Sequence, residues 1–327
     1  MRLGLSFDDV LLEPKYSEIT SRSKINIGNS LGDDLNFDIP IITAPMDTVT
    51  ESDMAACMGN AGALGIIHRY NSIQEQVNLV RGAKSHVVKV GAAIGTRGDY
   101  LERAIELVES GVSVLCLDVA HGHHILVRDA LTALRKSLPS RVHIMAGNVA
   151  TKKAFYDLSD WGANSIRVGI GGGSICSTRI QTGHGIPTLQ SVFECAEASR
   201  DMNVRLVADG GIKNSGDMVK ALAAGADFVM VGSLFAGTNH TPGEILKTKN
   251  GDYKVYRGMA SKEAQRAWKG SVSSREGIST TVPYVGSTED VLEELAIGIR
   301  SGFSYSGAKN IFELHTRSTF IQQTGGS

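Results

Sequence analysis

The sequence predicts an α/β protein with a (β/α)₈ TIM-barrel fold. Eight short runs rich in Val, Ile and Ala recur between residues 39 and 232, and segments with helical spacing separate them. The runs are nearly continuous rather than alternating in hydrophobicity, as expected of strands that are buried on both faces. Eight such strands alternating with helices indicate a closed parallel barrel, with a doubly wound open sheet as the alternative.

The elements follow a regular order along the chain. An N-terminal arm, including residues 7–14, precedes the first strand. Between the third and fourth strands, residues 100–109 place Leu101, Ile105 and Val108 on one helical face, and a last helix is expected at about 289–301. The expected strands are 39–44, 63–68, 87–94, 114–119, 143–148, 165–170, 205–208 and 228–232.

Two connections are longer than the rest. The segment between the sixth and seventh strands contains a glycine-rich loop that ends on Cys176, and residues 234–286 separate the eighth strand from the last helix. Long connections in a compact barrel are usually functional, and both leave the strand ends at which barrel enzymes place their chemistry. We therefore expect a single catalytic barrel domain, residues 1–327, with a flap at about 249–286.

The glycine-rich loop is a candidate nucleophile loop. Four glycines, at positions 169, 171, 172 and 173, precede Ser174 and Cys176. Such a run allows positive φ and leaves backbone N–H groups free to bind an anion, while converging N–H dipoles favour a thiolate. The alternative is a glycine-rich turn followed by an ordinary buried cysteine.

The last two expected strands end in residues suited to a nucleotide. Gly210 and Gly211 follow Asp209, and Gly232 precedes Ser233. Barrels commonly bind a phosphate at this place, and a carboxylate can accept hydrogen bonds from two ribose hydroxyls. The alternative for Asp209 is a plain turn at the end of a strand. Other polar or sulfur-containing residues at expected strand ends are Met46, Asp118, Asn148 and Arg167.

Composition narrows the class of partner. The formal net charge of −1 gives no signal for nucleic acid or for a membrane surface. The four cysteines form no C-x-x-C pair, so neither a zinc site nor a disulfide framework is suggested. The N-terminus lacks a signal-peptide pattern. We expect a cytoplasmic protein whose partners are small molecules or copies of itself.

Seven groups of residues resemble the IMP dehydrogenase and GMP reductase family of purine nucleotide enzymes. They are SFDDVLLEP (6–14), APMDTV (44–49), AGNV (146–149), VGIG with SIC (168–171 and 174–176), ADGG (208–211), GSLFAG (232–237) and YRGM (256–259). The resemblance implies a homotetrameric barrel that binds GMP or IMP, with Cys176 attacking C2 of the purine.

The same resemblance implies a role for each matching residue. The nucleotide phosphate is expected at Ser174, Gly211, Gly232, Ser233 and Tyr256, with the ribose at Asp209. The purine is expected against Met46, Gly258 and Met259, and the nicotinamide cofactor near Asp118, Asn148 and Arg167. A monovalent cation, K⁺, is expected at the backbone carbonyls of Gly171, Gly173 and Cys176.

The flap favours the reductase branch of this family. The dehydrogenase flap carries an Arg-Tyr pair whose Arg activates water, and no such pair lies between Met259 and Pro283. Glu276-Gly277 resembles the reductase flap, and no CBS insertion follows residue 68. Against this, segments 232–238, 242–244 and 256–259 are more similar to dehydrogenases.

We therefore expect reductive deamination of GMP to IMP and ammonia by NADPH, through a covalent thioimidate, with Thr178 and Glu276 moving protons. The main alternative is an IMP dehydrogenase without CBS domains that oxidises IMP to XMP with NAD. A nucleotide sensor without turnover and a flavin-dependent barrel enzyme are weaker alternatives.

Overall fold

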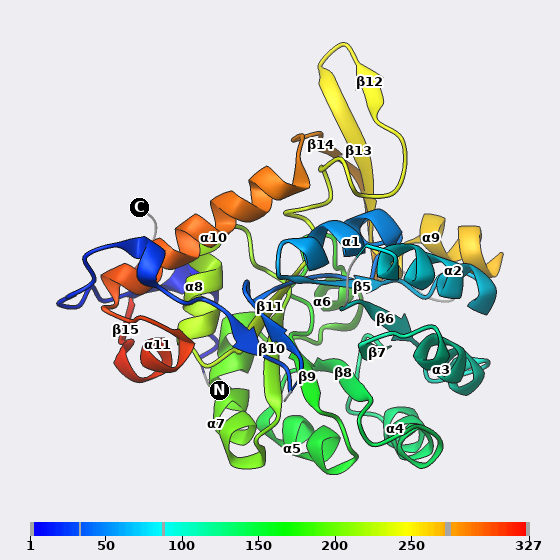
Figure 1. Ribbon diagram of the computed structural model, residues 1–327, viewed down its shortest axis with the longest axis horizontal. Coiled ribbons are helices and arrows are strands. Elements are labelled where there is room, and N and C mark those ends of the chain that lie inside the picture. The colour runs from blue at the N-terminus through cyan, green and yellow to red at the C-terminus, as the bar shows by residue number, and fades with distance from the viewer. Residues whose placement is uncertain (1–2, 33, 87–88, 272–275, 325–327) are drawn as a thin grey trace.

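Eight parallel strands close into a barrel in the computed structural model, which describes residues 3–32, 34–86, 89–271 and 276–324 (Figure 1). All eight predicted strands are present, so the barrel prediction is confirmed and the open sheet is excluded. In chain order the strands are β4 (Ile41–Thr43), β5 (Leu64–Ile67), β6 (Gly91–Ile94), β7 (Val114–Asp118), β8 (His143–Val149), β9 (Ser165–Val168), β10 (Arg205–Asp209) and β11 (Phe228–Val231).

Helices surround the barrel, as Figure 1 shows. Their buried faces pack on the outer side of the strands in one large apolar cluster. The surrounding helices are α1 (Ser52–Asn60), α2 (Ile73–Lys84), α3 (Tyr100–Glu109), α4 (Ile125–Ser137), α5 (Lys152–Asp160), α7 (Thr188–Met202), α8 (Ser215–Ala223) and α10 (Thr288–Tyr305). Side-chain caps fix several starts; for example, Ser72 accepts a hydrogen bond from Glu75 N at the start of α2.

A second apolar cluster fills the barrel interior, and a short hairpin closes one end. The hairpin consists of β2 (Asn29–Ser30) and β3 (Asn36–Phe37). Phe37 packs edge-on against Phe228 at the start of β11, with ring centroids 5.8 Å apart. Because this end is filled, ligands are left the opposite end, where the barrel strands finish.

The N-terminal arm and the C-terminal segment are held together. Strand β1 (Val10–Leu12) pairs antiparallel with β15 (Phe320–Gln322), so the two ends of the chain lie on the same side of the molecule (Figure 1). The 3₁₀ helices η1 (Phe7–Asp9) and η2 (Arg22–Lys24) belong to the arm, and α11 (Ile311–Arg317) precedes β15.

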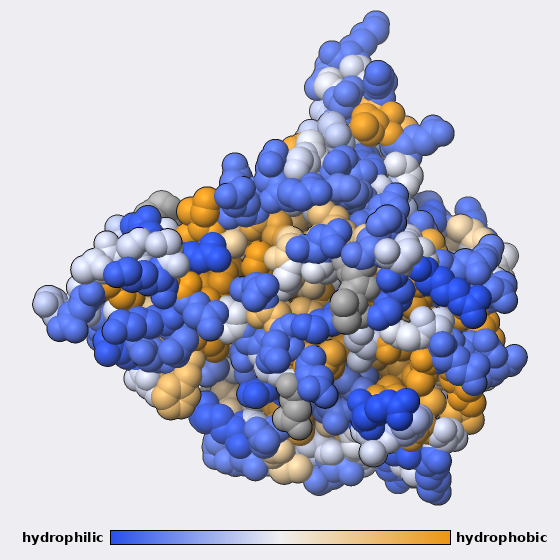
Figure 2. All heavy atoms as spheres, viewed as in Figure 1, coloured by the Kyte–Doolittle hydropathy of each residue, from blue (hydrophilic) through white to orange (hydrophobic). Residues whose placement is uncertain are grey.

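The expected flap contains regular structure that the sequence analysis did not predict. Strands β12 (Leu246–Thr248), β13 (Gly251–Arg257) and β14 (Ser279–Pro283) form an antiparallel sheet, and α9 (Lys262–Lys269) lies between β13 and β14. The β12–β13 hairpin projects from the body, and Figure 2 shows that its surface is largely hydrophilic. Residues 272–275 of the expected flap, like 87–88 of the third expected strand, lie outside the described residues.

In the part of the chain that the structure describes, every helix is too short or too polar to cross a membrane.

Candidate active site

A cavity of about 320 Å³ lies at the ends of the barrel strands. It is bounded by the glycine-rich loop, by the loops after β10 and β11 and by the flap. Every residue that the sequence analysis assigned to a site lines this cavity: Met46, Asp118, Asn148, Arg167, Gly171, Gly173, Ser174, Cys176, Thr178, Asp209, Gly211, Gly232, Ser233, Tyr256, Gly258, Met259 and Glu276. Residues from eight strands and two long loops therefore meet at one place.

The loop after β9 presents Cys176 to the cavity. Gly169 has φ +148°, and a Cβ atom there would lie 1.9 Å from the carbonyl oxygen of Asp209, so only glycine fits. The Cys176 amide donates to the carbonyl of Gly173 at 3.1 Å, which turns the chain back toward the cavity. Cys176 remains partly exposed, and the short helix α6 (Thr178–Thr182) begins two residues later.

The flap is hydrogen-bonded to this loop. The Ser177 amide donates to the Glu276 carbonyl at 3.0 Å, the Ile278 amide donates to Ile175 at 3.1 Å, and Cys176 forms a bridge with Gly277. This pairing brings the Glu276 side chain over the nucleophile loop. The Thr178 hydroxyl donates to Glu276 at 2.9 Å, and the Cys176 sulfur lies 3.2 Å from the same hydroxyl oxygen.

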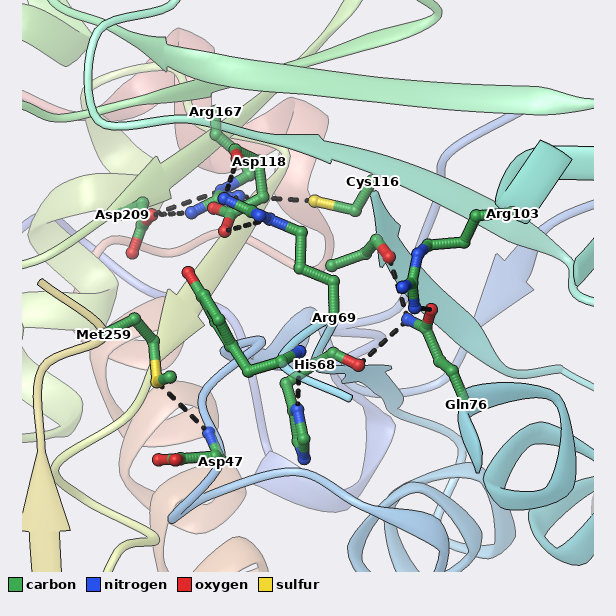
Figure 3. A network of polar contacts seen from close by, with 12 residues as sticks. Asp47, His68, Arg69, Gln76, Arg103, Cys116, Asp118, Arg167, Asp209 and Met259 are labelled. Atoms are coloured by element: carbon green, nitrogen blue, oxygen red, sulfur yellow. Dashed lines mark hydrogen bonds and ion pairs between the residues drawn. The ribbon is translucent and has the colours of Figure 1, made fainter. Parts of the chain in front are cut away.

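A buried arginine joins the carboxylates of two barrel strands, as Figure 3 shows. Arg167 donates to Asp118 at 2.7 Å and to Asp209 at 2.9 and 3.2 Å, and Asn148 also donates to Asp209 at 2.8 Å. The three hydrogen bonds to Asp209 all end on its Oδ2. The strand register therefore fixes the orientation of the Asp209 carboxylate before any ligand arrives.

The charges around Arg167 keep it ionised. Burial acts to lower the pKa of Arg167, but the Cys116 sulfur and the carboxylates of Asp118 and Asp209 raise it well above its usual value. Cys116 lies 3.3 Å from the guanidinium, and burial raises the pKa of this thiol to about 11. Cys116 is thus a neutral thiol beneath the charged residues.

The side of the cavity formed by β4, β11 and β13 gathers the residues expected to bind phosphate and purine. The Tyr256 hydroxyl is hydrogen-bonded to Ser174, and burial raises the pKa of Tyr256 to about 12. A Cβ atom on Gly232 would lie 3.0 Å from the Tyr256 hydroxyl and 3.1 Å from the Met46 sulfur. A glycine is therefore required where these three residues converge.

One lining residue, Tyr70, was not predicted. Its ring lies 5.0 Å from that of Trp268 in an edge-on arrangement, and the Arg69 guanidinium lies 4.9 Å from the Tyr70 ring centroid. Trp268 belongs to α9, so this contact attaches the flap to the end of β5. The available signal was the position of Tyr70, three residues beyond the last residue of β5.

A family model described as the IMP dehydrogenase / GMP reductase domain matches residues 4–327. The chain belongs to this family.

Relatives carry both names within the family. The chain is 34% identical to an inosine-5'-monophosphate dehydrogenase from Nitrosopumilus maritimus over 98% of this chain and 96% of the relative. It is 35% identical to a GMP reductase from Buchnera aphidicola over 98% of this chain and 95% of the relative. These similar identities do not separate the two activities.

A solved structure shares the whole architecture. It is a cysteine-to-alanine variant of GMP reductase from Trypanosoma brucei in complex with guanosine 5'-monophosphate, with a TM-score of 0.95 and 29% identity over 99% of this chain and 96% of that chain. The IMP dehydrogenase and GMP reductase family consists of oxidoreductases that use nicotinamide cofactors. The protein is accordingly an oxidoreductase of purine nucleotide metabolism.

Proposed function

We propose that this family member is a GMP reductase, which converts GMP to IMP and ammonia with NADPH. The contact from Cys176 through Thr178 to Glu276 carries the proposal, because it places a proton-transferring pair beside the nucleophile. The structure neighbour that binds guanosine 5'-monophosphate adds support. A dehydrogenase must also activate water, and the Arg-Tyr pair expected for that step is missing from residues 259–283.

In the proposed reaction the Cys176 thiolate adds to C2 of GMP. Thr178 and Glu276 deliver a proton to the exocyclic amine, which leaves as ammonia, and the purine stays bonded to sulfur as a thioimidate. The nicotinamide cofactor, when bound, supplies a hydride to C2. The carbon–sulfur bond then breaks, the electron pair returns to Cys176, and IMP is released. Atoms and charges balance without a hydrolytic step.

The cavity also suits the expected nucleotide. The residues for the phosphate lie on the glycine-rich loop, the last two barrel strands and β13, and Asp209 is held between them and Arg167. Because Arg167 and Asn148 both bond Oδ2 of Asp209, we assign Oδ1 to the ribose hydroxyls. Met46, Gly258 and Met259 would contact the purine from the β4 side and from the flap.

An unused acceptor supports a nicotinamide ring near Asp118, Asn148 and Arg167. Asn148 Oδ1 is buried and lacks a hydrogen-bond partner among the described residues, although its Nδ2 group donates to both Gly169 and Asp209. A buried acceptor of this kind matches the N–H groups of a carboxamide. Asn148 would orient the ring by this bond.

Two further parts of the proposal concern assembly and a cation. Gly173 uses its carbonyl once, toward Cys176 N, and a carbonyl oxygen has a second lone pair for K⁺. The carbonyls of Gly171 and Cys176 would complete the site from this chain. A homotetramer is proposed because large apolar side chains such as Ile180 and Phe312 stay exposed, 81% and 75% respectively. Light scattering of the purified protein tests this assembly.

One paired assay tests the proposed activity. Purified protein is incubated with GMP and NADPH, and separately with IMP and NAD, while the nicotinamide absorbance is followed. We expect loss of NADPH and release of ammonia in the first reaction and no XMP in the second. Rapid XMP formation from IMP would overturn the proposal in favour of an IMP dehydrogenase, which the dehydrogenase-like segments 232–238 and 256–259 favour.

The covalent step has its own test. Cys176→Ala should abolish turnover and the nucleotide adduct detected by mass spectrometry of the quenched enzyme. Cys195→Ala, which changes a buried cysteine of α7 outside the cavity, should keep both. An adduct that still forms in Cys176→Ala would exclude this mechanism.

A further inference from the structure

Three side chains of metal-ligand type meet outside the catalytic cavity. Cys57 lies in α1, His240 in the loop after β11 and Glu289 in the first turn of α10. The Cys57 sulfur, a His240 ring nitrogen and a Glu289 carboxylate oxygen all lie within 4.8 Å of one another. None of the three residues lines the catalytic cavity. Their separation along the chain explains why the sequence suggested no zinc site.

The histidine of this cluster has an unsatisfied nitrogen. His240 Nδ1 is buried and has no hydrogen-bond partner among the described residues. Glu289 Oε2 is 3.7 Å away, which is too far for a hydrogen bond. An unsatisfied buried ring nitrogen costs on the order of 1–3 kcal/mol. A cation between the nitrogen and the carboxylate would remove this cost.

The cluster is buried on one side and open on the other. Cys57 is 7% exposed, whereas the side chains of His240 and Glu289 are 29% and 56% exposed. A cation can therefore enter beside Glu289, and a water molecule can take a fourth position there. Ser287 donates a hydrogen bond to Glu289 Oε2 at 3.0 Å, which holds the carboxylate in the way that outer hydrogen bonds hold metal ligands.

The donor set selects the kind of metal. One sulfur, one imidazole nitrogen and one carboxylate oxygen suit Zn²⁺, which binds all three atom types and tolerates an open fourth position. Bonds of about 2.0–2.3 Å in a tetrahedral site place neighbouring ligand atoms roughly 3.3–3.8 Å apart. The His240–Glu289 separation of 3.7 Å already falls in this interval.

We propose that Cys57, His240 and Glu289 bind Zn²⁺, with water as the fourth ligand, and that the ion joins α1 to α10 and to the loop after β11. The thiol proton leaves to solvent when the metal–sulfur bond forms. Without the ion, burial and then the charge of Glu289 raise the pKa of Cys57 to about 12, and the thiol is hydrogen-bonded to Glu289. The site does not depend on the proposed reductase activity.

Co²⁺ is the probe for this site, because a cobalt–thiolate bond has its own charge-transfer absorption. The full chain carries Cys176→Ala, which removes the partly exposed thiol, and is freed of metal with a chelator. We expect one equivalent of Co²⁺ to give a charge-transfer band and the intense visible bands of four-coordination. One equivalent of Zn²⁺ should bleach both and raise the melting temperature.

Matched variants identify the ligands. Cys57→Ser should remove the charge-transfer band, and Cys195→Ser should keep it. Glu289→Gln should weaken Co²⁺ binding by about 10-fold or more, whereas Asp290→Asn, at the next exposed carboxylate, should leave the affinity unchanged. Because Glu289 is exposed, its variant reports even if Cys57→Ser fails to fold.

Two results would overturn the proposal. A metal-free protein that shows no charge-transfer band with excess Co²⁺ would make the cluster a hydrogen-bonded contact only. A band that persists at equal affinity in Cys57→Ser and Glu289→Gln would place the metal elsewhere.

Discussion

The Glu276 carboxylate lies 2.9 Å from the Thr178 hydroxyl, although 98 residues separate the two in the chain. Thr178 begins the short helix after the nucleophile, and Glu276 is delivered by the flap. Backbone hydrogen bonds from Ser177 and Ile278 hold the flap in this position. The proposed chemistry therefore depends on the flap reaching the nucleophile loop.

Replacing Glu276 with Gln should slow ammonia release by about 10²- to 10⁴-fold. Gln keeps an acceptor for the Thr178 hydroxyl but cannot take up or deliver a proton. GMP affinity, measured by calorimetry, should change little, because Glu276 contacts no residue assigned to the phosphate or ribose. Ammonia release under saturating GMP and NADPH measures the step.

The matched control is Glu263→Gln, at an exposed carboxylate of α9 in the same flap. It should keep the rate of the unaltered protein. A Glu276→Gln protein that releases ammonia at the normal rate would rule out the proton-transfer role.

The barrel and its mouth could be predicted because they follow from local pattern. Strands such as β5 and β11 are buried along their full length and appear in the sequence as continuous apolar runs. Once eight parallel strands are assigned, their C-terminal ends must meet, which placed Asp118, Arg167 and Asp209 together. Their ion pairing could not be predicted, because it depends on how the barrel closes.

The flap shows why the rest could not be predicted. In β13 the alternation predicts Val255 inside and Lys254 outside, yet Lys254 is 2% exposed and Val255 is 38% exposed. The Lys254 ammonium donates to the backbone carbonyls of Thr241 and Thr238 at 2.6 and 3.4 Å. Acceptors supplied by a distant loop thus outweigh the hydrophobic pattern of the strand.

Replacing Arg167 with Met should lower the free energy of unfolding by about 3–5 kcal/mol, because it leaves two carboxylates buried without their cation. Arg167→Lys should not restore the loss, since one ammonium cannot form the forked contacts with Asp118 and Asp209. Urea unfolding measures the difference. Arg128→Met, which removes an exposed pair with Asp129, should change stability by less than about 0.5 kcal/mol.

Stability should fall in acid because of His143. Burial, helped by the charge of Arg135, lowers the pKa of His143 to about 4, and the ring is bonded to Ser165 at 2.8 Å. The unfolded chain takes up this proton near pH 6.5, whereas the folded chain takes it up only near pH 4. The unfolded state therefore binds more protons in this interval, and stability present above pH 6.5 is lost as pH falls toward 4.

His143→Gln, which can keep the bond to Ser165, should remove about 2 kcal/mol of the loss in stability between pH 7.5 and pH 5.0. Urea midpoints at the two pH values measure it. His86→Gln, at an exposed histidine, should keep the pH dependence of the unaltered protein. Equal slopes for the two variants would show that another group controls acid unfolding.

Gly169→Ala should damage both stability and nucleotide binding. The added Cβ atom would lie 1.9 Å from the Asp209 carbonyl oxygen, so β9 and β10 must separate at their ends. We expect a loss of more than about 2 kcal/mol on urea unfolding and at least tenfold weaker GMP binding, because Asp209 moves with its backbone. Gly98→Ala separates strain from collision, since Gly98 also has positive φ, +64°, but an added Cβ meets nothing within 4 Å. It should cost about 1 kcal/mol and leave GMP affinity intact. Equal losses in the two variants would mean that backbone conformation, rather than the close approach of β9 to Asp209, fixes this side of the cavity.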